Sequence, residues 1–288
     1  MTDLRRIIWL ASYPKSGNTW MRSLLAHYFM PPGKAPDINN LRQFTTGDTR
    51  ADFFDRAAGG KYKGKTLKDW SQTRQIVLRL IAASKPNKHF VKTHCKPVFF
   101  LDTHLIPPEV TAGAIYIIRN PFDVVPSFAR HVSATNDDTI DRLCNPDAIM
   151  GTENKIYDAL GRWDDHVSAW TTAPGLPRHV VRYEDMLDKP DKVLSGLLQF
   201  LGVKPDHPKM THAIKATSFE AMKKQEEKLG FGEKPTGMKS FFAKGRAGGW
   251  REDLTPAQVG RIREEFSSTL ETWYPELLEE VDAFAKAS

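Results

Sequence analysis

A short polar loop near the N-terminus carries the residue types that bind phosphate or sulfate. It reads Tyr-Pro-Lys-Ser-Gly-Asn-Thr over residues 13–19, between an apolar run at 7–12 and a segment with Trp20 and Leu24 at helical spacing. A strand, a tight loop and a helix N-terminus present free backbone N–H groups at the positive end of the helix dipole. Lys15 adds a positive side chain. The predicted chemistry is the binding of a phosphate or sulfate group.

The loop departs from the P-loop of nucleotide kinases. That motif reads Gly-x-x-x-x-Gly-Lys-Ser/Thr, with the lysine after the final glycine. Here Lys15 lies two residues before Gly17, the only glycine of the loop. An ordinary strand-to-helix turn with a surface lysine also fits these residues, so the loop alone leaves both interpretations open.

Two further polar stretches follow predicted strands. Lys92-Thr93-His94 ends one of them, and histidine acts as a general base near neutral pH. A neighbouring cation such as Lys92 favours the neutral imidazole that accepts a proton. Arg119 ends another strand, and its planar fork suits a phosphate. A structural histidine and an ion pair between Arg119 and Asp123 are the plainer interpretations of the same residues.

The elements that position these side chains alternate between strands and helices. We expect strands at 7–12, 89–94, 114–119 and 179–183, a long helix at 156–170, and a last long helix at 256–270. We expect a long, partly irregular segment at 34–66 and irregular segments at 133–152 and 229–249. The alternation predicts an α/β fold, a single P-loop-like domain over residues 1–288 with a central parallel sheet flanked by helices on both faces. Sites in such sheets lie at the carboxyl ends of the strands.

The composition is that of a globular protein that favours anionic partners. The 288 residues are 40% hydrophobic and 26% charged, with a formal net charge of +6. Cys95 and Cys144, the two cysteines, make neither a disulfide framework nor a zinc-ligand spacing. There is no signal peptide and no run of 18 apolar residues. We therefore expect a reducing, cytoplasmic location, no membrane association and no metal.

Several stretches taken together resemble the PAPS-dependent sulfotransferases, where PAPS is 3′-phosphoadenosine 5′-phosphosulfate. They follow one another in the family's order. They lie at residues 13–20, 92–94, 115–127, 183–186, 217–220 and 242–250. From this agreement the chain is identified as a member of the family, similar to the cytosolic small-molecule sulfotransferases.

The resemblance implies an enzyme that moves the sulfuryl group of PAPS to a hydroxyl or amine of a small acceptor and releases PAP, the 3′,5′-bisphosphate. Lys15 and Lys92 would neutralise the charge that develops during in-line transfer, and His94 would take the acceptor's proton. The implied nucleotide contacts are Lys15, Ser16, Gly17, Asn18, Thr19, Trp20, Arg119, Ser127, Tyr183, Thr217, Phe219, Lys244, Gly245 and Arg246.

The resemblance also divides these contacts between the parts of the nucleotide. Arg119, Ser127 and the backbone near Lys244 would bind the 3′-phosphate, because flexible glycine positions let N–H groups surround an anion. The adenosine would meet Trp20, Tyr183, Thr217 and Phe219. Ala243 stands where the family usually has an arginine, and Arg246 is the residue expected to replace it.

Two other functions fit parts of the sequence. An ATP-dependent small-molecule kinase on a P-loop fold would need a lysine after the glycine-rich loop and an aspartate for Mg²⁺, and neither is evident. A nucleic-acid binder fits the net charge, but the aromatic residues lie mostly at helix-core spacing. We therefore predict a small-molecule partner and no nucleic acid.

The acceptor and the oligomeric state are not readable from the sequence. Residues 34–66, 133–152 and 229–242 are expected to shape the acceptor pocket. Many cytosolic members dimerise through Lys-x-x-x-Thr-Val-x-x-x-Glu near the C-terminus. The aligned positions here are Arg251, Thr255, Pro256 and Gly260. This degenerate motif argues against the family's usual dimer.

Overall fold

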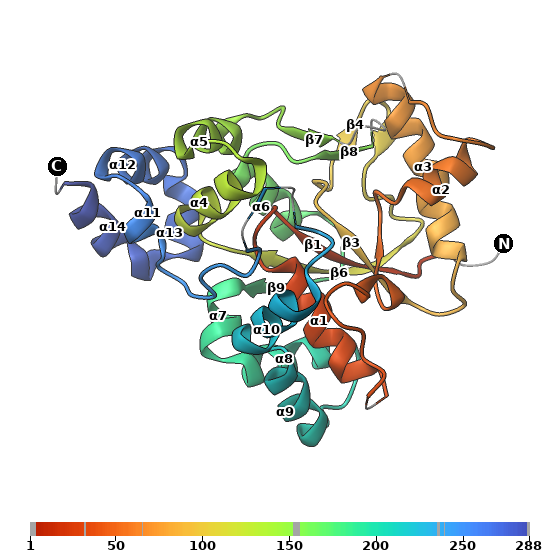
Figure 1. The fold of residues 1–288 in the computed structure, drawn as a ribbon. Coiled ribbons are helices and arrows are strands. Elements are labelled where there is room, and N and C mark those ends of the chain that lie inside the picture. The colour runs from red at the N-terminus through yellow and green to blue at the C-terminus, as the bar shows by residue number, and fades with distance from the viewer. Residues whose placement is uncertain are drawn as a thin grey trace.

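The centre of the molecule is a parallel sheet of five strands in the order β2-β3-β1-β6-β9 (Figure 1). The computed structural model describes residues 4–31, 33–64, 66–151, 156–234, 237–238 and 240–286. The strands are β1 Ile7–Ser12, β2 Thr46–Gly47, β3 His89–Thr93, β6 Thr111–Ile118 and β9 Arg178–Arg182. Each pairs in parallel with its neighbours. All five carboxyl ends therefore lie at one edge of the sheet.

Helices cover both faces of this sheet. Successive side chains of a strand point to opposite faces, and here the apolar side chains on both faces are buried under helices. In β1, Trp9 packs into one core cluster and Leu10 into the other. The cluster around Leu10 includes α1 Asn18–Phe29, α7 Tyr183–Asp188, α8 Pro190–Phe200 and α9 His207–Ala216. The cluster around Trp9 includes α3 Leu67–Ala83, α4 Pro121–Val132 and α6 Trp163–Thr172. The predicted α/β fold class is confirmed.

The remaining elements flank these two layers. They are α2 Ala51–Ala57, α5 Asn136–Cys144, α10 Phe219–Leu229, α11 Trp250–Asp253, α12 Pro256–Glu265, α13 Ser267–Trp273, α14 Leu278–Ala285, the short 3₁₀ helices Leu41–Gln43 and Pro275–Leu277, and the hairpins β4 Phe99–Phe100 with β5 Thr103–His104 and β7 Ile149–Gly151 with β8 Tyr157–Ala159. Within the described residues, no helix combines the length and apolar character needed to span a membrane.

Side-chain caps fix the start of several helices. Ser218 accepts a hydrogen bond from the N–H of Ala221 and begins α10. Thr255 and Gln258 form a capping box at the start of α12, where Pro256 occupies the first turn. These capping hydrogen bonds depend only on residues within one helical turn, so they can be recognised in the sequence.

Three sequence predictions about the connecting segments are wrong. Residues 133–152 contain α5, which is fixed by a capping box between Thr135 and Asp138 and by two buried apolar side chains. The helix expected at 156–170 begins only at Trp163, because β8 pairs with β7 before it. The last long helix is interrupted at Phe266, whose backbone leaves the helical region with φ −117° and ψ 22°.

Candidate active site

The carboxyl ends of the strands open onto a cavity of about 310 Å³. Every predicted site residue lines this cavity except Ser16, which is buried within the loop. The lining comes from the loop after β1, the ends of β3, β6 and β9, helices α4 and α10, the hairpin of β7 and β8, and the segment before α11. The fold thus brings together residues that are more than 200 positions apart in the chain.

The loop between β1 and α1 has a backbone suited to an anion. Lys15 and Gly17 both have positive φ, of 68° and 98°. A Cβ on Gly17 would lie 2.6 Å from Cδ2 of Tyr183, so only glycine fits there. The side chain of Asn18 is turned inward, and its Nδ2 donates to the carbonyl of Leu10 at 2.9 Å. Helix α1 has no side-chain cap, which leaves its first N–H groups available to a ligand.

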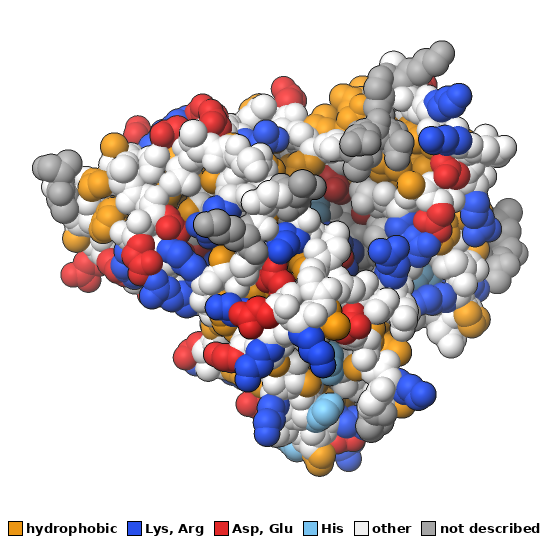
Figure 2. Space-filling model, viewed as in Figure 1, with side chains coloured by type: hydrophobic (Ala, Val, Ile, Leu, Met, Phe, Trp, Pro, Cys, Tyr) orange, Lys and Arg blue, Asp and Glu red, His pale blue; other side chains and the backbone are white. Residues whose placement is uncertain are grey.

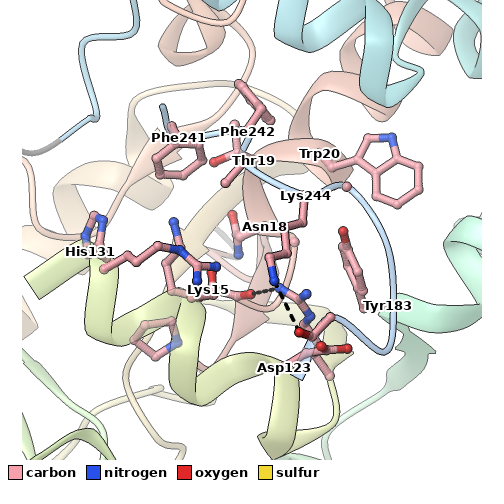
Figure 3. Close-up of a pocket in the computed structure, with 18 of the residues that line it drawn as sticks. Lys15, Asn18, Thr19, Trp20, Asp123, His131, Tyr183, Phe241, Phe242 and Lys244 are labelled. Carbon is pink, nitrogen blue, oxygen red and sulfur yellow. Dashed lines mark hydrogen bonds between the residues drawn. The ribbon is translucent and has the colours of Figure 1, made fainter. Parts of the chain in front are cut away.

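Positive charges converge on Lys15. Burial, followed by Arg119, Arg130 and Lys92, lowers the pKa of Lys15 to about 7. Its Nζ lies 3.6 Å from the centre of the Phe241 ring, and His131 lies beside it in the close-up (Figure 3). A site that crowds cations in this way is built to receive an anion.

Arg119 joins the loop to the end of β6. Its Nη1 donates to the main-chain carbonyl of Lys15 at 2.9 Å, and its guanidinium lies 4.3 Å from the centre of the Tyr183 ring. The predicted alternative, an ion pair with Asp123, does not form. Asp123 instead accepts hydrogen bonds from the N–H groups of Gly248 and Trp250 at 2.8 Å and 3.0 Å. This carboxylate holds the segment before α11 against the start of α4.

His94 follows β3 and is held in one tautomer. Its Nδ1 lies 2.7 Å from the main-chain oxygen of Ser12, which accepts only, so Nδ1 carries the proton. The lone pair of the neutral ring is therefore on Nε2. Burial, followed by the charge of Lys92, holds the pKa of His94 well below its usual value. The ring is neutral at physiological pH and able to accept a proton.

Helix α6 holds the backbone of this residue. Nε2 of His166 donates to the main-chain oxygen of His94 at 3.1 Å, and Nδ1 of His166 accepts from the hydroxyl of Tyr116 at 2.9 Å. One turn later, Nε1 of Trp170 donates to the carbonyl of Cys95 at 3.2 Å. Two side chains of one helix thus fix two consecutive carbonyls at the end of β3.

Lys92 faces a carboxylate inside the cavity. Its Nζ lies 3.9 Å from Oε2 of Glu233, and the same carboxylate pairs with Nη2 of Arg22 at 2.8 Å. Burial and the nearby Arg22 lower the pKa of Lys92. Glu233 therefore acts as an internal counter-ion for two cations of the site.

Aromatic rings form the part of the cavity near α1 and β9. The rings of Trp20 and Tyr183 meet edge to face at 5.7 Å and lie together in Figure 3. Gly245 has φ of 60°, and a Cβ there would lie 2.0 Å from Cδ2 of Phe219. Thr217 is fully buried, and its hydroxyl donates to the carbonyl of Ala213 at 2.8 Å. Flat apolar faces and a close backbone approach are suited to a purine ring.

The basic residues before α11 are paired with acids. Nζ of Lys244 lies 2.9 Å from Asp253 and 3.1 Å from Glu252. Arg246 is exposed and pairs with Glu252 as well. Both cations line the cavity, so an anionic ligand would compete with these carboxylates for them.

Some lining residues lie outside every segment that the sequence singled out for the acceptor pocket; they are Pro126, Arg130, His131, Asp158 and Met222. Two of the segments expected to shape that pocket, 133–152 and 229–242, do reach the cavity, through Met150 and through Glu233, Met238, Phe241 and Phe242. Asp158 was hidden because its segment was expected to be helical. Among the described residues of 34–66, none lines the cavity, contrary to the prediction for the acceptor pocket.

The structure also brings two carboxylates together beside the site. Ligand atoms of Asp48, Cys95 and Asp158 lie within 4.8 Å of one another. Arg74, which is fully buried, donates to Oδ2 of Asp48 at 2.6 Å. This acidic pair was not predicted, and the guanidinium of Arg74 already neutralises Asp48.

Comparisons with known proteins agree with this geometry. A family model described as a sulfotransferase domain matches residues 5–274. Sulfotransferase 1C2 from Homo sapiens is 28% identical over 279 residues, which cover 91% of this chain and 82% of that protein. Sulfotransferase 1A1 from Rattus norvegicus is 25% identical over 277 residues, covering 91% and 83%.

Two solved structures share the fold. The structure of mouse sulfotransferase SULT7A1 complexed with PAP has a TM-score of 0.62 and 19% identity, covering 98% of this chain and 90% of that chain. The structure of retinol dehydratase in a complex with retinol and PAP has a TM-score of 0.62 and 20% identity, covering 93% and 82%.

Proposed function

This chain belongs to the sulfotransferase family, and from that premise we propose that it transfers the sulfuryl group of PAPS to a hydroxyl or amine of a small-molecule acceptor. Membership of the family favours this reaction over the ATP-dependent kinase that the sequence left open. The observation that carries the proposal is the cavity in which Lys15, Lys92, His94 and Arg119 meet at the ends of neighbouring strands.

The donor end of the site supports PAPS. The loop at 13–19, with its uncapped helix and Lys15, suits the 5′-phosphosulfate. Arg119, Ser127 and the backbone around Gly245 suit the 3′-phosphate, and the aromatic pair Trp20 and Tyr183 suits the adenine. PAP is the nucleotide named for both neighbouring structures, which supports the same choice here.

The chemistry follows from the neutral His94. The acceptor oxygen forms a bond to sulfur while the bond from sulfur to the 5′-phosphate oxygen breaks, and PAP leaves. Nε2 of His94 takes the proton of the acceptor hydroxyl. Lys15 and Lys92 stabilise the charge on the leaving oxygen and on the sulfuryl oxygens, where it grows in the transition state.

The surface is consistent with a small acceptor. Figure 2 shows basic and acidic side chains interspersed on the face that it displays, whereas a nucleic-acid binder would favour a basic stripe. We propose a small hydroxyl or amine compound as partner. A cytoplasmic location and the loss of the family's usual dimer contact remain predictions.

The test is to substitute the proposed base. His94→Ala should lower kcat by about 10²–10⁴-fold, the usual contribution of a general base, while PAP affinity stays nearly unchanged. Acceptors come from a screen of hydroxylated compounds for PAP release, and PAP affinity is measured by calorimetry. Full turnover by a folded His94→Ala protein would remove His94 from the mechanism.

A further inference from the structure

Among the residues that the structure describes, four carboxylates line the cavity, and three of them have strong partners within the protein. Asp123 accepts two main-chain N–H groups. Asp253 pairs with Lys244 at 2.9 Å. Glu233 pairs with Arg22 at 2.8 Å. Each of these three is held in place by the protein itself.

Asp158 lacks such a partner. Among the described residues it forms no ion pair, and its one hydrogen bond comes from the thiol of Cys95, with 3.8 Å between Sγ and Oδ1. A thiol is a weak donor, so this bond does little to satisfy a carboxylate. Burying a carboxylate without an N–H or cationic partner costs free energy. A ligand that supplies such a partner removes this cost.

The cations near Asp158 are paired with other carboxylates. Its neighbour Asp48 is neutralised by the buried Arg74 at 2.6 Å. Burial, followed by the charge of Asp48, raises the pKa of Asp158 to about 7. The charge of Lys92 lowers the pKa of Asp158, but the ion-pair partner of Lys92 is Glu233, at 3.9 Å. Among the described residues Asp158 therefore has no ion pair of its own, and a cationic ligand would favour its ionised form.

Asp158 lines the same cavity as His94, the proposed base. Asp158 lies on β8 opposite Met150 of β7, and both side chains line the cavity. Its thiol partner Cys95 directly follows His94, the proposed base. Met238 and Phe241 line the same cavity. Thioether and aromatic walls favour an apolar body, and they also tolerate a cation.

We infer that the acceptor carries an ammonium group on an apolar body and that Asp158 binds this ammonium. The inference rests on the proposed function and adds the class of acceptor to it. An ammonium gives the carboxylate a charged donor and favours its ionised form, whereas a hydroxyl gives it only a neutral donor.

The probes are two pairs of hydroxy compounds in which a methyl group replaces the ammonium. They are tyramine with 4-propylphenol, and 3-aminocyclohexanol with 3-methylcyclohexanol. PAP release from PAPS is measured at pH 7.5 for the full-length protein. In at least one pair the amine should be preferred in kcat/KM by about tenfold or more, the value of one charge-assisted hydrogen bond.

Three variants assign the preference to this carboxylate. Asp158→Asn should lower kcat/KM for the amine by about tenfold and leave the neutral member unchanged, whereas Asp158→Glu should retain the preference. Asp147→Asn removes an exposed carboxylate beside the same hairpin and should change neither. PAP affinity and melting temperature of each variant report its folding.

The outcomes separate this inference from the proposed function. Equal or better use of both neutral compounds, or no turnover of any of the four, overturns the inference. An amine preference that survives Asp158→Asn also overturns it. Tight PAP binding by calorimetry in either case leaves the donor site and the proposed function standing, while absence of PAP binding removes that function itself.

Discussion

Lys15 lies in a cluster of positive charge, and this makes PAP binding dependent on pH. Burial and the charges of Arg119, Arg130 and Lys92 lower the pKa of the free Lys15 to about 7. A phosphate group bound at the loop supplies the opposite charge and raises that pKa again. Binding of PAP near neutral pH should therefore take up a proton.

The size of this uptake follows from the pKa. At pH 7 about half of the free Lys15 is charged, so binding takes up ~0.5 proton; at pH 8 the uptake rises to ~0.9, and at pH 6 it falls to ~0.1. Because protons bind with the ligand, PAP affinity should fall as the pH rises through 7. The fall should continue until the pKa of the bound state is reached.

Calorimetry measures the uptake directly. Titrating PAP in two buffers with different ionisation enthalpies gives the number of protons exchanged at each pH. Lys15→Arg keeps the charge but does not titrate in this range, so the difference between wild type and this variant isolates Lys15 from the protons of PAP itself. Lys192→Met, at an exposed position on α8, should behave as wild type.

The result that refutes this reasoning is equal proton uptake by wild type and Lys15→Arg at pH 7 and pH 8. Lys15 would then be fully charged in the free protein, or remote from the bound nucleotide. A flat dependence of wild-type PAP affinity on pH between 6 and 8 would lead to the same conclusion.

Three further predictions concern the rest of the site. The protein should prefer PAP over 5′-AMP by at least about a hundredfold, and Arg119→Ala should erase much of this preference; equal wild-type affinities in calorimetry would remove the 3′-phosphate site. Gly245→Ala should weaken PAP binding by roughly tenfold or more, because its φ of 60° and a ring 2.0 Å away resist a Cβ, whereas Gly175→Ala, with φ of 68° and open space, should not. His166→Phe should lower kcat by about tenfold or more and alter the pH–rate profile, while His166→Gln keeps a donor to His94 and should restore both; unchanged kcat in the Phe variant would contradict a positioning role.

The residues that were predictable share a local signal. The loop at 13–19, His94 and Arg119 all follow apolar strands, and the rule that parallel sheets place their sites at strand ends puts them together. The structure agrees, since most residues of this loop line one cavity together with His94 and Arg119. Resemblance to the sulfotransferase family added Thr217 and Gly245 to the predicted site. The periodicity of hydrophobic residues would not have selected either of them.

Asp158 and the ion pair behind it were not predictable, for the opposite reason. Asp158 enters the cavity from a three-residue strand whose partner β7 is equally short, and two such strands give no periodic pattern. The pairing of Arg74 with Asp48 joins a helix to the end of an edge strand, and no local rule connects them. The sequence showed these as unremarkable charged residues, and only tertiary contacts reveal what they face.

The sheet order has a consequence for how the protein folds. Ala11 in the central strand pairs with Thr93 on one side and with Tyr116 on the other, so both pairings join distant parts of the chain. Contacts of such long sequence separation form slowly, because the intervening loops lose entropy first. A chain that has paired β1 with β3 but not with β6 holds Lys15 and His94 without Arg119. PAP should therefore recognise only the completed sheet, slowing unfolding while leaving the rate of folding unchanged.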